Sequence, residues 1–567
     1  MRPVPILSAA LLLASAAAPA LAHGGTYRSP ALPPDDPGRG PGRGGTATDP
    51  GWESWWWVHQ DPELERARRR APAASGAETN GGALGRTTGG EDGNVVPDAA
   101  PDERAFLERE VLPAVTRALE DTEAEVRSAA AVALGKMGFP RSFLPLQAAL
   151  RDEHPDVRDG AVLALGMVGD PFALDPLRAI LFDPAREERT RGFAALALGL
   201  AGGEDAAALL ASFLSPASDA ARVGGLRKTD DLLCCAVIAL ARTGAPSAAA
   251  VLRRELSADG RPSFPVRCSA AAALGRIGDR ESIPILLHAL EHEDARMRQS
   301  AAVALGMLGK PGDGAVVAAL ARAGRGDPDA GARGCALQAL GRIGGPAAVQ
   351  VLRPVFREGR STDRAQAALA LGAAGDVGAG PALHRVFRES GGAWIRGALA
   401  LALGMSGYRP AAEDLRAVAL GKEEAALRGH AMTALALLGG PAASGDLRAV
   451  LLSDRDPWLR CTAARGLRLL GDRSAVRPLQ GLATGPGTAH DRSQACYFLG
   501  ILGGPDAART LLRVLANREE EMAVRMHAVA GLGVLGDRSP VPVLASLSAD
   551  TNHLLPVAPL QEVQTFL

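Results

Sequence analysis

The chain has 567 residues, of which 47% are hydrophobic and only 4% aromatic, and its formal net charge is −1. This balance excludes the basic excess that is typical of proteins binding nucleic acid or anionic membranes. Small aliphatic side chains must form the core, which favours closely packed helices. A compact globule of this length would need several domains, so a repeat array is the simpler alternative.

The first 22 residues have the pattern of a signal peptide. Arg2 precedes an apolar stretch over residues 6–18, and an A-x-A cleavage motif ends at Ala22. Cleavage there would leave His23 as the first residue. No later run reaches the roughly 18 uninterrupted apolar residues of a membrane span. We therefore expect an exported protein, periplasmic or extracellular, that does not insert into the membrane.

Residues 51–70 form a predicted helix between two segments without a core. Residues 23–50 and 71–100 are rich in Pro, Gly, Ala or Ser, and we expect a flexible segment and a linker there. The helix carries four of the six tryptophans: Trp52, Trp55, Trp56 and Trp57. Their spacing places several of them on one helix face. We expect the helix to dock in cis, as a cap or in a groove of the domain that follows; binding a partner directly is the alternative.

Residues 101–567 have an internal period. An Arg recurs every 31 to 35 residues, apart from one gap of 42, in twelve of thirteen repeats. The thirteen reference positions are Arg127, Arg158, Arg191, Leu233, Arg267, Arg298, Arg333, Arg364, Arg396, Arg428, Arg460, Arg492 and Arg525. Ala follows three residues later in twelve repeats, and Leu and Gly follow seven and eleven residues later in all thirteen. Four columns in phase over this length predict one structural unit repeated along the chain.

Each column has a physical role. Ala and Leu share one helix face, where Ala lets a neighbouring helix approach and Leu fills the layer. The Gly eleven residues after the reference fits the left-handed residue just past a helix. A second Gly, eight after the reference in ten repeats, costs helix stability, so it predicts close backbone packing. A shorter first helix, such as residues 142–150 or 282–290, completes each repeat.

These motifs resemble HEAT repeats, in particular the short repeats of the phycobilisome lyases, in a protein of secreted bacterial type. The phrase from Asp156-Val157-Arg158 to Asp170 carries the signature. The resemblance implies an all-α, α-α superhelix of ARM/HEAT type with about 13 repeats. It also implies that the Arg column pairs with acids of adjacent repeats. Four aspartates lie six residues before a reference position: Asp121, Asp152, Asp327 and Asp454.

The repeat count predicts an elongated, curved solenoid of roughly 130 Å, at about 10 Å per repeat. We expect residues 554–567 to form an apolar helix that closes its C-terminal end. The six cysteines are expected to be free thiols, because equivalent helices lie about 8–10 Å apart, beyond the reach of a disulfide.

A partner would bind on the concave face, which the second helices line in HEAT solenoids. Positions five and nine after the reference should point there. The candidate partner-binding residues are Val132, Leu163, Met167, Leu196, Ile238, Val303, Met307, Leu369, Leu401 and Met405. An apolar groove of this kind receives a helix or an extended peptide. The sequence thus favours an exported protein-interaction scaffold without a cofactor; burial of these side chains between neighbouring helices is the alternative.

Enzymatic chemistry has little support in the sequence, and we expect no enzyme. Deoxyhypusine hydroxylase, another HEAT-repeat protein, builds its site from four His-Glu pairs, whereas this chain has one, His292-Glu293. The alternative function is metal binding or catalysis. His23 could bind copper through its imidazole and the terminal amine, and His288 and His292 have the i, i+4 spacing of a helical metal-binding pair.

Overall fold

The computed structural model describes residues 52–70, 101–215, 228–257 and 263–537, and, near the C-terminus, 539, 545–548, 551, 552, 555 and 557–563. This part of the chain contains helices and no strand. The predicted signal peptide, the segments 23–50 and 71–100 and His23 lie outside it. None of the helices in the described part is long and apolar enough to cross a membrane.

Thirteen helix pairs of the described residues form the repeats, each with an outer and an inner helix. The inner helices are α4 (Ala124–Met137), α6 (Pro155–Val168), α8 (Glu188–Ala201), α11 (Asp230–Leu240), α13 (Phe264–Arg276), α15 (Ala295–Leu308), α17 (Ala330–Ile343), α19 (Ser361–Ala373), α21 (Ala393–Ser406), α23 (Ala425–Leu438), α25 (Pro457–Leu470), α27 (Ala489–Leu502) and α29 (Met522–Gly536). The outer helices are α3 (Leu112–Ala118), α5 (Phe143–Ala149), α7 (Leu174–Leu181), α9 (Gly203–Leu214), α12 (Ala248–Ser257), α14 (Ile283–Ala289), α16 (Gly314–Gly326), α18 (Gly345–Glu358), α20 (Gly380–Glu389), α22 (Ala412–Leu420), α24 (Pro441–Ser453), α26 (Val476–Thr484) and α28 (Pro505–Ala516).

The remaining helices are short or stand apart from the repeats. They are α1 (Trp52–Arg70), α2 (Pro101–Phe106), α30 (Ala545–Ser548), α31 (Ala558–Val563), a π turn η2 (Leu107–Val111), and the 3-10 turns η3 (Pro140–Ser142), η4 (Pro171–Ala173), η5 (Arg280–Ser282), η6 (Val377–Ala379) and η7 (Arg409–Ala411). The predicted all-α superhelix of about thirteen repeats is confirmed.

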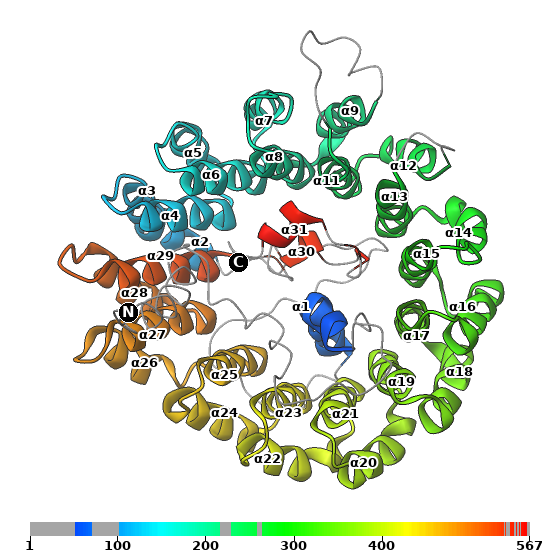
Figure 1. Ribbon diagram of the computed structural model, residues 1–567. Helices are drawn as coiled ribbons and strands as arrows, with labels where there is room; N and C mark the ends of the chain where they lie inside the picture. Colours follow the sequence, from blue (N-terminus) through cyan, green and yellow to red (C-terminus); the bar gives the residue numbers. More distant parts are fainter. Residues whose placement is uncertain are drawn as a thin grey trace, which may run out of the picture.

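The repeats close into a ring (Figure 1). Each inner helix packs on the next, and α29 of the last repeat packs on α4 of the first in the same way. The expectation of an elongated, open solenoid is therefore wrong. A small rotation at every repeat interface adds up, over thirteen repeats, to a full turn, so the two ends meet and bury one another.

The glycine eight residues after the reference lets the inner helices touch. A Cβ placed on Gly341 would lie 2.7 Å from the Cα of Ala370 in the next repeat. Where the ring closes, a Cβ on Gly533 would lie 2.9 Å from the Cα of Ala133 in the first repeat. The closing interface thus repeats the backbone contact of the internal ones. The predicted reason for this glycine, close backbone packing, is confirmed.

The glycine eleven residues after the reference has a positive φ at the end of most inner helices. Gly138 has φ 62° and Gly471 has φ 69°, a region that costs glycine nothing. The column departs from this at two positions. Gly309 has φ −67°, and Gly536 is the last residue of α29.

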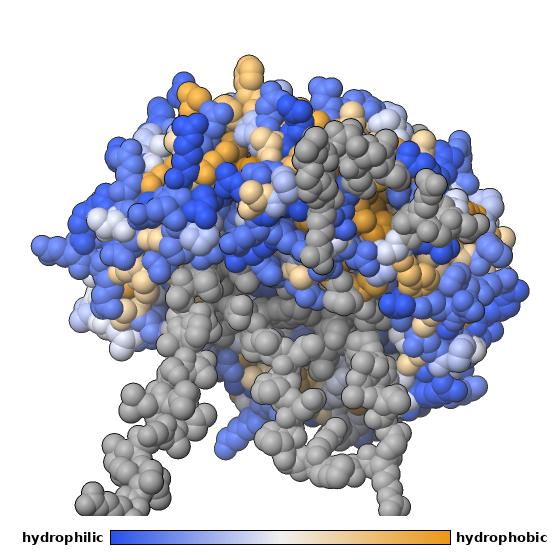
Figure 2. Space-filling model, turned by 45° about the horizontal axis from the view of Figure 1, so that its top comes forward, coloured by the Kyte–Doolittle hydropathy of each residue, from blue (hydrophilic) through white to orange (hydrophobic). Residues whose placement is uncertain are grey.

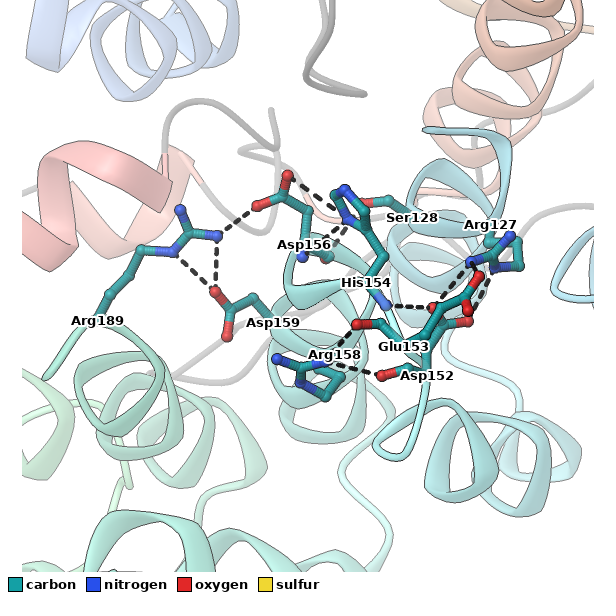
Figure 3. A network of polar contacts seen from close by, with 9 residues as sticks. All are labelled: Arg127, Ser128, Asp152, Glu153, His154, Asp156, Arg158, Asp159 and Arg189. Atoms are coloured by element: carbon teal, nitrogen blue, oxygen red, sulfur yellow. Dashed lines mark hydrogen bonds and ion pairs between the residues drawn. The ribbon is translucent and has the colours of Figure 1, made fainter. Parts of the chain in front are cut away.

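Several of the reference arginines pair with acids of the following repeat. Arg127 donates two hydrogen bonds, of 2.8 and 2.9 Å, to Asp152 of the next repeat (Figure 3). All four aspartates six residues before a reference position accept from the arginine of the preceding repeat, the remaining pairs being Arg298 with Asp327, Arg428 with Asp454, and Arg525 with Asp121. The last pair joins repeat thirteen to repeat one. The pairing is confirmed for these four aspartates and continues across the closure. Elsewhere the pairing is interrupted: Arg158, Arg267 and Arg364 donate hydrogen bonds to backbone carbonyl oxygens.

The C-terminal residues lie inside the ring, not at an end of it (Figure 1). Within the segment expected to cap the solenoid, the described helix α31 packs against α8 and α11. Arg242 holds Ser546 by hydrogen bonds of 2.7 Å to its carbonyl oxygen and 2.9 Å to its Oγ. Asn552 donates a 3.0 Å hydrogen bond to Ser300 Oγ. The capping prediction is wrong, because the first repeat already covers the end that the cap would have covered.

On the face shown in Figure 2, the described residues are mostly hydrophilic, with hydrophobic residues in patches between them. The core lies between the outer and inner helices, and every leucine of the column seven after the reference is buried in it. The six cysteines are free thiols, as predicted.

Candidate helix-binding site on the inner face

Helix α1 lies inside the ring against α19, α21 and α23 (Figure 1). Trp52 is 1% exposed and Trp56 is 5% exposed. Together with Leu64 and Ala67 of the same helix they bury an apolar stripe of the ring. That stripe consists of Ala365, Leu369, Ala398, Leu401 and Met405. The side chains of Trp55 and Trp57 lie outside the described part of the structure.

Trp52 sits in an aromatic pocket. Its ring centroid is 6.1 Å from that of Trp394 and 5.1 Å from that of His430. Gly397 forms the floor, since a Cβ there would lie 3.1 Å from Cζ2 of Trp52 and 2.9 Å from Nδ1 of His430. The pocket therefore has room for an indole because Gly397 has no side chain. Burial lowers the pKa of His430 to about 4, so the imidazole is neutral at pH 7.

Polar contacts hold α1 at two further points. Asp61 pairs with Arg465 of α25, and this negative charge raises the pKa of the guanidinium. Arg70, the last residue of α1, donates to the carbonyl oxygen of Ala373, the last residue of α19. Carbonyl groups at a helix C-terminus have no partner within the helix, so a guanidinium is a suitable donor there. These contacts fix the direction in which α1 crosses the ring.

The candidate partner-binding residues lie on inner helices in several environments. Leu369, Leu401 and Met405 are covered by α1. Val132, Leu163, Leu196 and Ile238 are also buried, while Met167, Val303 and Met307 are half-buried. Ile238 lines a small cavity together with residues of the C-terminal segment, among them Leu555 and Leu560. The inner face therefore has two occupants from the same chain, α1 and the C-terminal segment, and α1 also packs against α30 of that segment.

The candidate metal ligands are not brought together. His288 is exposed on α14, which ends at Ala289, so His292 lies beyond the helix and the expected i, i+4 pairing on one helix is wrong. His292 instead accepts a 3.0 Å hydrogen bond from the backbone of Asp294. Among the described residues no group of three or more His, Cys, Asp and Glu side chains could hold a metal ion.

Sequence reasoning missed the polar side of this site. Arg465 belongs to the column five residues after the reference, where most repeats carry an apolar residue. A charged residue in an inward-facing column was a signal that something acidic lies opposite. Asp61, nine residues after Trp52 on α1, provides that charge.

Comparison with known proteins places these helix pairs in a family. A family model described as HEAT repeats matches residues 143–223, 255–333, 304–372, 412–492 and 445–523, and a HEAT repeat model matches residues 111–139. These matches cover more than half of the chain, and the chain belongs to the HEAT-repeat family. No curated protein matches it significantly.

Solved structures share the helical-repeat fold at low identity. Human deoxyhypusine hydroxylase in complex with glycerol is 21% identical over 52% of this chain and 95% of that chain, with a TM-score of 0.22. The CpcE–CpcF complex of phycocyanin lyase from a Nostoc species is 24% identical over 44% and 96%, with a TM-score of 0.29. Importin beta is 16% identical over 77% and 70%, with a TM-score of 0.34. At these identities and TM-scores the likeness carries no argument about this chain.

Proposed function

We propose that this chain is an exported protein-interaction scaffold whose inner face binds a peptide or helix of a protein partner. One observation carries the proposal: the inner face of α19, α21 and α23 buries the two tryptophans Trp52 and Trp56 of an amphipathic segment that is not part of the repeats. A surface that accepts a helix from its own chain has the shape and apolar character to accept one from another protein.

A binding role without catalysis fits the chemistry of this face. Its residues are apolar or aromatic, and the titratable groups beside α1 make structural contacts. His430 is neutral and packed between Trp52 and Trp458, and Arg465 is paired with Asp61. The thiol of Cys461 lies near Arg465, but burial raises its pKa, so it is not the thiolate that nucleophilic chemistry requires.

Site-directed photo-crosslinking tests the proposal. A photo-reactive residue at Thr433, half-buried on the inner helix α23, should capture a protein from an envelope extract. The matched control is Leu144, which is 70% exposed on the outer helix α5. We expect a product specific to Thr433 that grows when Trp52 and Trp56 are changed to Ala. Products from Leu144 alone, or none from either position, would contradict an inner-face scaffold.

Export is tested on the mature chain. Mass spectrometry of the protein purified from its native cell should find His23 at the N-terminus, in a periplasmic or extracellular fraction. A cytoplasmic chain that begins with Met1 would contradict this part of the proposal.

A further inference from the structure

The cluster around α1 is separate from the core of the ring. The buried members of the two clusters do not overlap, although the half-buried Ile395 and Leu469 pack against both. Most of the ring core is therefore formed without α1. Removing α1 would expose Leu369, Leu401 and Met405 side by side with Trp394. A contiguous apolar patch of this kind on a soluble protein marks a binding site. Methionine suits such a surface because its flexible side chain adapts to different partners.

The surface also has features that select its ligand. The Gly397 floor admits an indole, and Arg465 requires a carboxylate at a set distance along the bound helix. In α1 these needs are met by Trp52, by Trp56 four residues later and by Asp61 five residues after that. Leu64 and Ala67 continue the buried face. The site therefore recognises a spacing of side chains on a helix, which another chain can reproduce.

Helix α1 meets these needs imperfectly. Pro62 lies inside it, where proline removes a backbone hydrogen bond and strains the preceding turn. Trp52 Nε1 is buried, and among the described residues no acceptor lies within hydrogen-bond distance of it. Burial also lowers the pKa of the Arg70 guanidinium. A helix with the same side chains and no proline would fit the site better than the resident one.

We propose that the inner face of α19, α21, α23 and α25 is a receptor site for a helix of a partner protein. The partner helix has two aromatic residues four apart, and a carboxylate five residues after the second. Helix α1 occupies this site until such a helix displaces it. The proposal deepens the proposed scaffold function and rests on it. The carboxylate pairs with Arg465, and the first aromatic residue enters the pocket above Gly397.

A labelled peptide tests the proposal on the full mature chain. The probe is residues 52–70 with Pro62→Ala, carrying a fluorophore at its C-terminus, and binding is followed by anisotropy. The site is vacated in the double variant Trp52→Ala, Trp56→Ala. We expect the peptide to bind this variant at least about tenfold more tightly than the wild type, because no resident helix competes. Equal affinity for both chains would overturn the displacement model.

A charge exchange tests the recognition of the carboxylate. A peptide with Asp61→Lys should bind the vacated chain at least about tenfold more weakly, and the additional change Arg465→Glu in the ring should restore its binding. Arg69, whose side chain is 59% exposed, provides the control, since Arg69→Ala in the peptide should change nothing. The contact between Asp61 and Arg465 would be contradicted if the peptides with and without the Asp61→Lys change bound equally well. It would also be contradicted if Arg465→Glu did not restore binding.

Two outcomes separate this inference from the scaffold function. In the first outcome, a partner is crosslinked at Thr433 but the peptide does not bind. This result would support the scaffold function and overturn the proposed receptor site. A wild-type dimer that is lost in the Trp52→Ala, Trp56→Ala variant would mean that a second copy of α1 is the natural ligand, which would overturn the assignment to a different partner.

Discussion

Two interfaces bring distant parts of this chain together, and they are built differently. Where α29 meets α4, Gly533 touches Ala133 and Arg525 pairs with Asp121, the same contacts that join neighbouring repeats. Where α1 meets the ring, large aromatic side chains fill a pocket, and Asp61 forms an ion pair with Arg465. The first interface continues the fold itself, whereas the second is added to a fold that is already complete.

This difference predicts two kinds of response to mutation. Changes at the closure should affect the stability and shape of the whole ring, because each repeat relies on both neighbours. Changes at the α1 site should release α1 and leave the ring intact.

The largest effect is expected for Asp121→Ala. Its carboxylate is 2% exposed and accepts from both Arg518 and Arg525, so its loss leaves a buried arginine without its ion-pair partner. We expect the free energy of unfolding to fall by about 3–5 kcal/mol. The ring should also open below the urea midpoint, seen as a larger radius of gyration by X-ray scattering.

The matched control for this change is Asp152→Ala, which removes the same kind of ion pair from Arg127 at an internal interface. It should lower stability by a similar amount and leave the first and last repeats in contact. If the radius of gyration increased equally in the two variants, the ring would not open preferentially at the interface between α29 and α4.

A smaller effect is expected from a methyl group on two glycines of α21. A Cβ on Gly404 would lie 2.6 Å from the Cα of Ala434, so Gly404→Ala should lower the free energy of unfolding by about 1–3 kcal/mol. At Gly397 the atoms nearest to such a Cβ belong to the side chains of His430 and Trp52. Gly397→Ala should leave ring unfolding unchanged, or stabilise it by up to about 1 kcal/mol through helix propensity, while loosening α1.

Urea denaturation and hydrogen exchange of α1 amides measure the two responses separately. Loss of ring stability in Gly397→Ala, or intact ring stability in Gly404→Ala, would remove the distinction between the two interfaces.

The smallest effect is a pH dependence of α1 docking. His430 has a pKa of about 4 in the docked state and an ordinary value of about 6.5 when exposed. Between these values the undocked state binds more protons, so docking is strongest above about pH 6.5 and weakens as the pH falls. At about pH 5.5 docking should be roughly tenfold weaker.

A fluorophore on Arg69→Cys would report the release of α1 through its anisotropy. His430→Gln, which cannot titrate, should abolish the response between about pH 4 and 6.5. An unchanged response in that variant would assign the pH dependence to another group.

Much of the fold could be predicted from the sequence because the repeat is local. The register of Arg, Ala, Leu and Gly predicted helix pairs and the close backbone contacts made by glycines such as Gly341. The resemblance to HEAT repeats added the pairing of the arginines with aspartates such as Asp152. Ring closure could not be derived in the same way, because it depends on small rotations summed over all interfaces. One signal was present: Asp121 precedes the first reference position, so in an open solenoid no arginine of a preceding repeat would pair with it.

The candidate site was harder to predict for a related reason. The tryptophan spacing in residues 51–70 indicated a docking helix, and Leu369, Leu401 and Met405 were expected on the inner face. Which inner helices receive α1 depends on two single residues, Gly397 and Arg465, whose roles become visible only when the ring and α1 are seen together. A contact made by one residue in one repeat does not recur along the chain, so it produces no periodic pattern in the sequence.

An engineered disulfide across the closure tests the ring most directly. A Cβ on Gly536 would lie 3.5 Å from the Cβ of Met137, within the range of a disulfide. The native thiols should not compete, since burial raises the pKa of Cys234, Cys268, Cys335 and Cys496 to about 12. In the variant Met137→Cys, Gly536→Cys, a closed ring predicts an intramolecular bond and faster migration in a non-reducing denaturing gel than Met137→Cys alone. Thiols that stay reduced, or that link two chains, would contradict the closed ring.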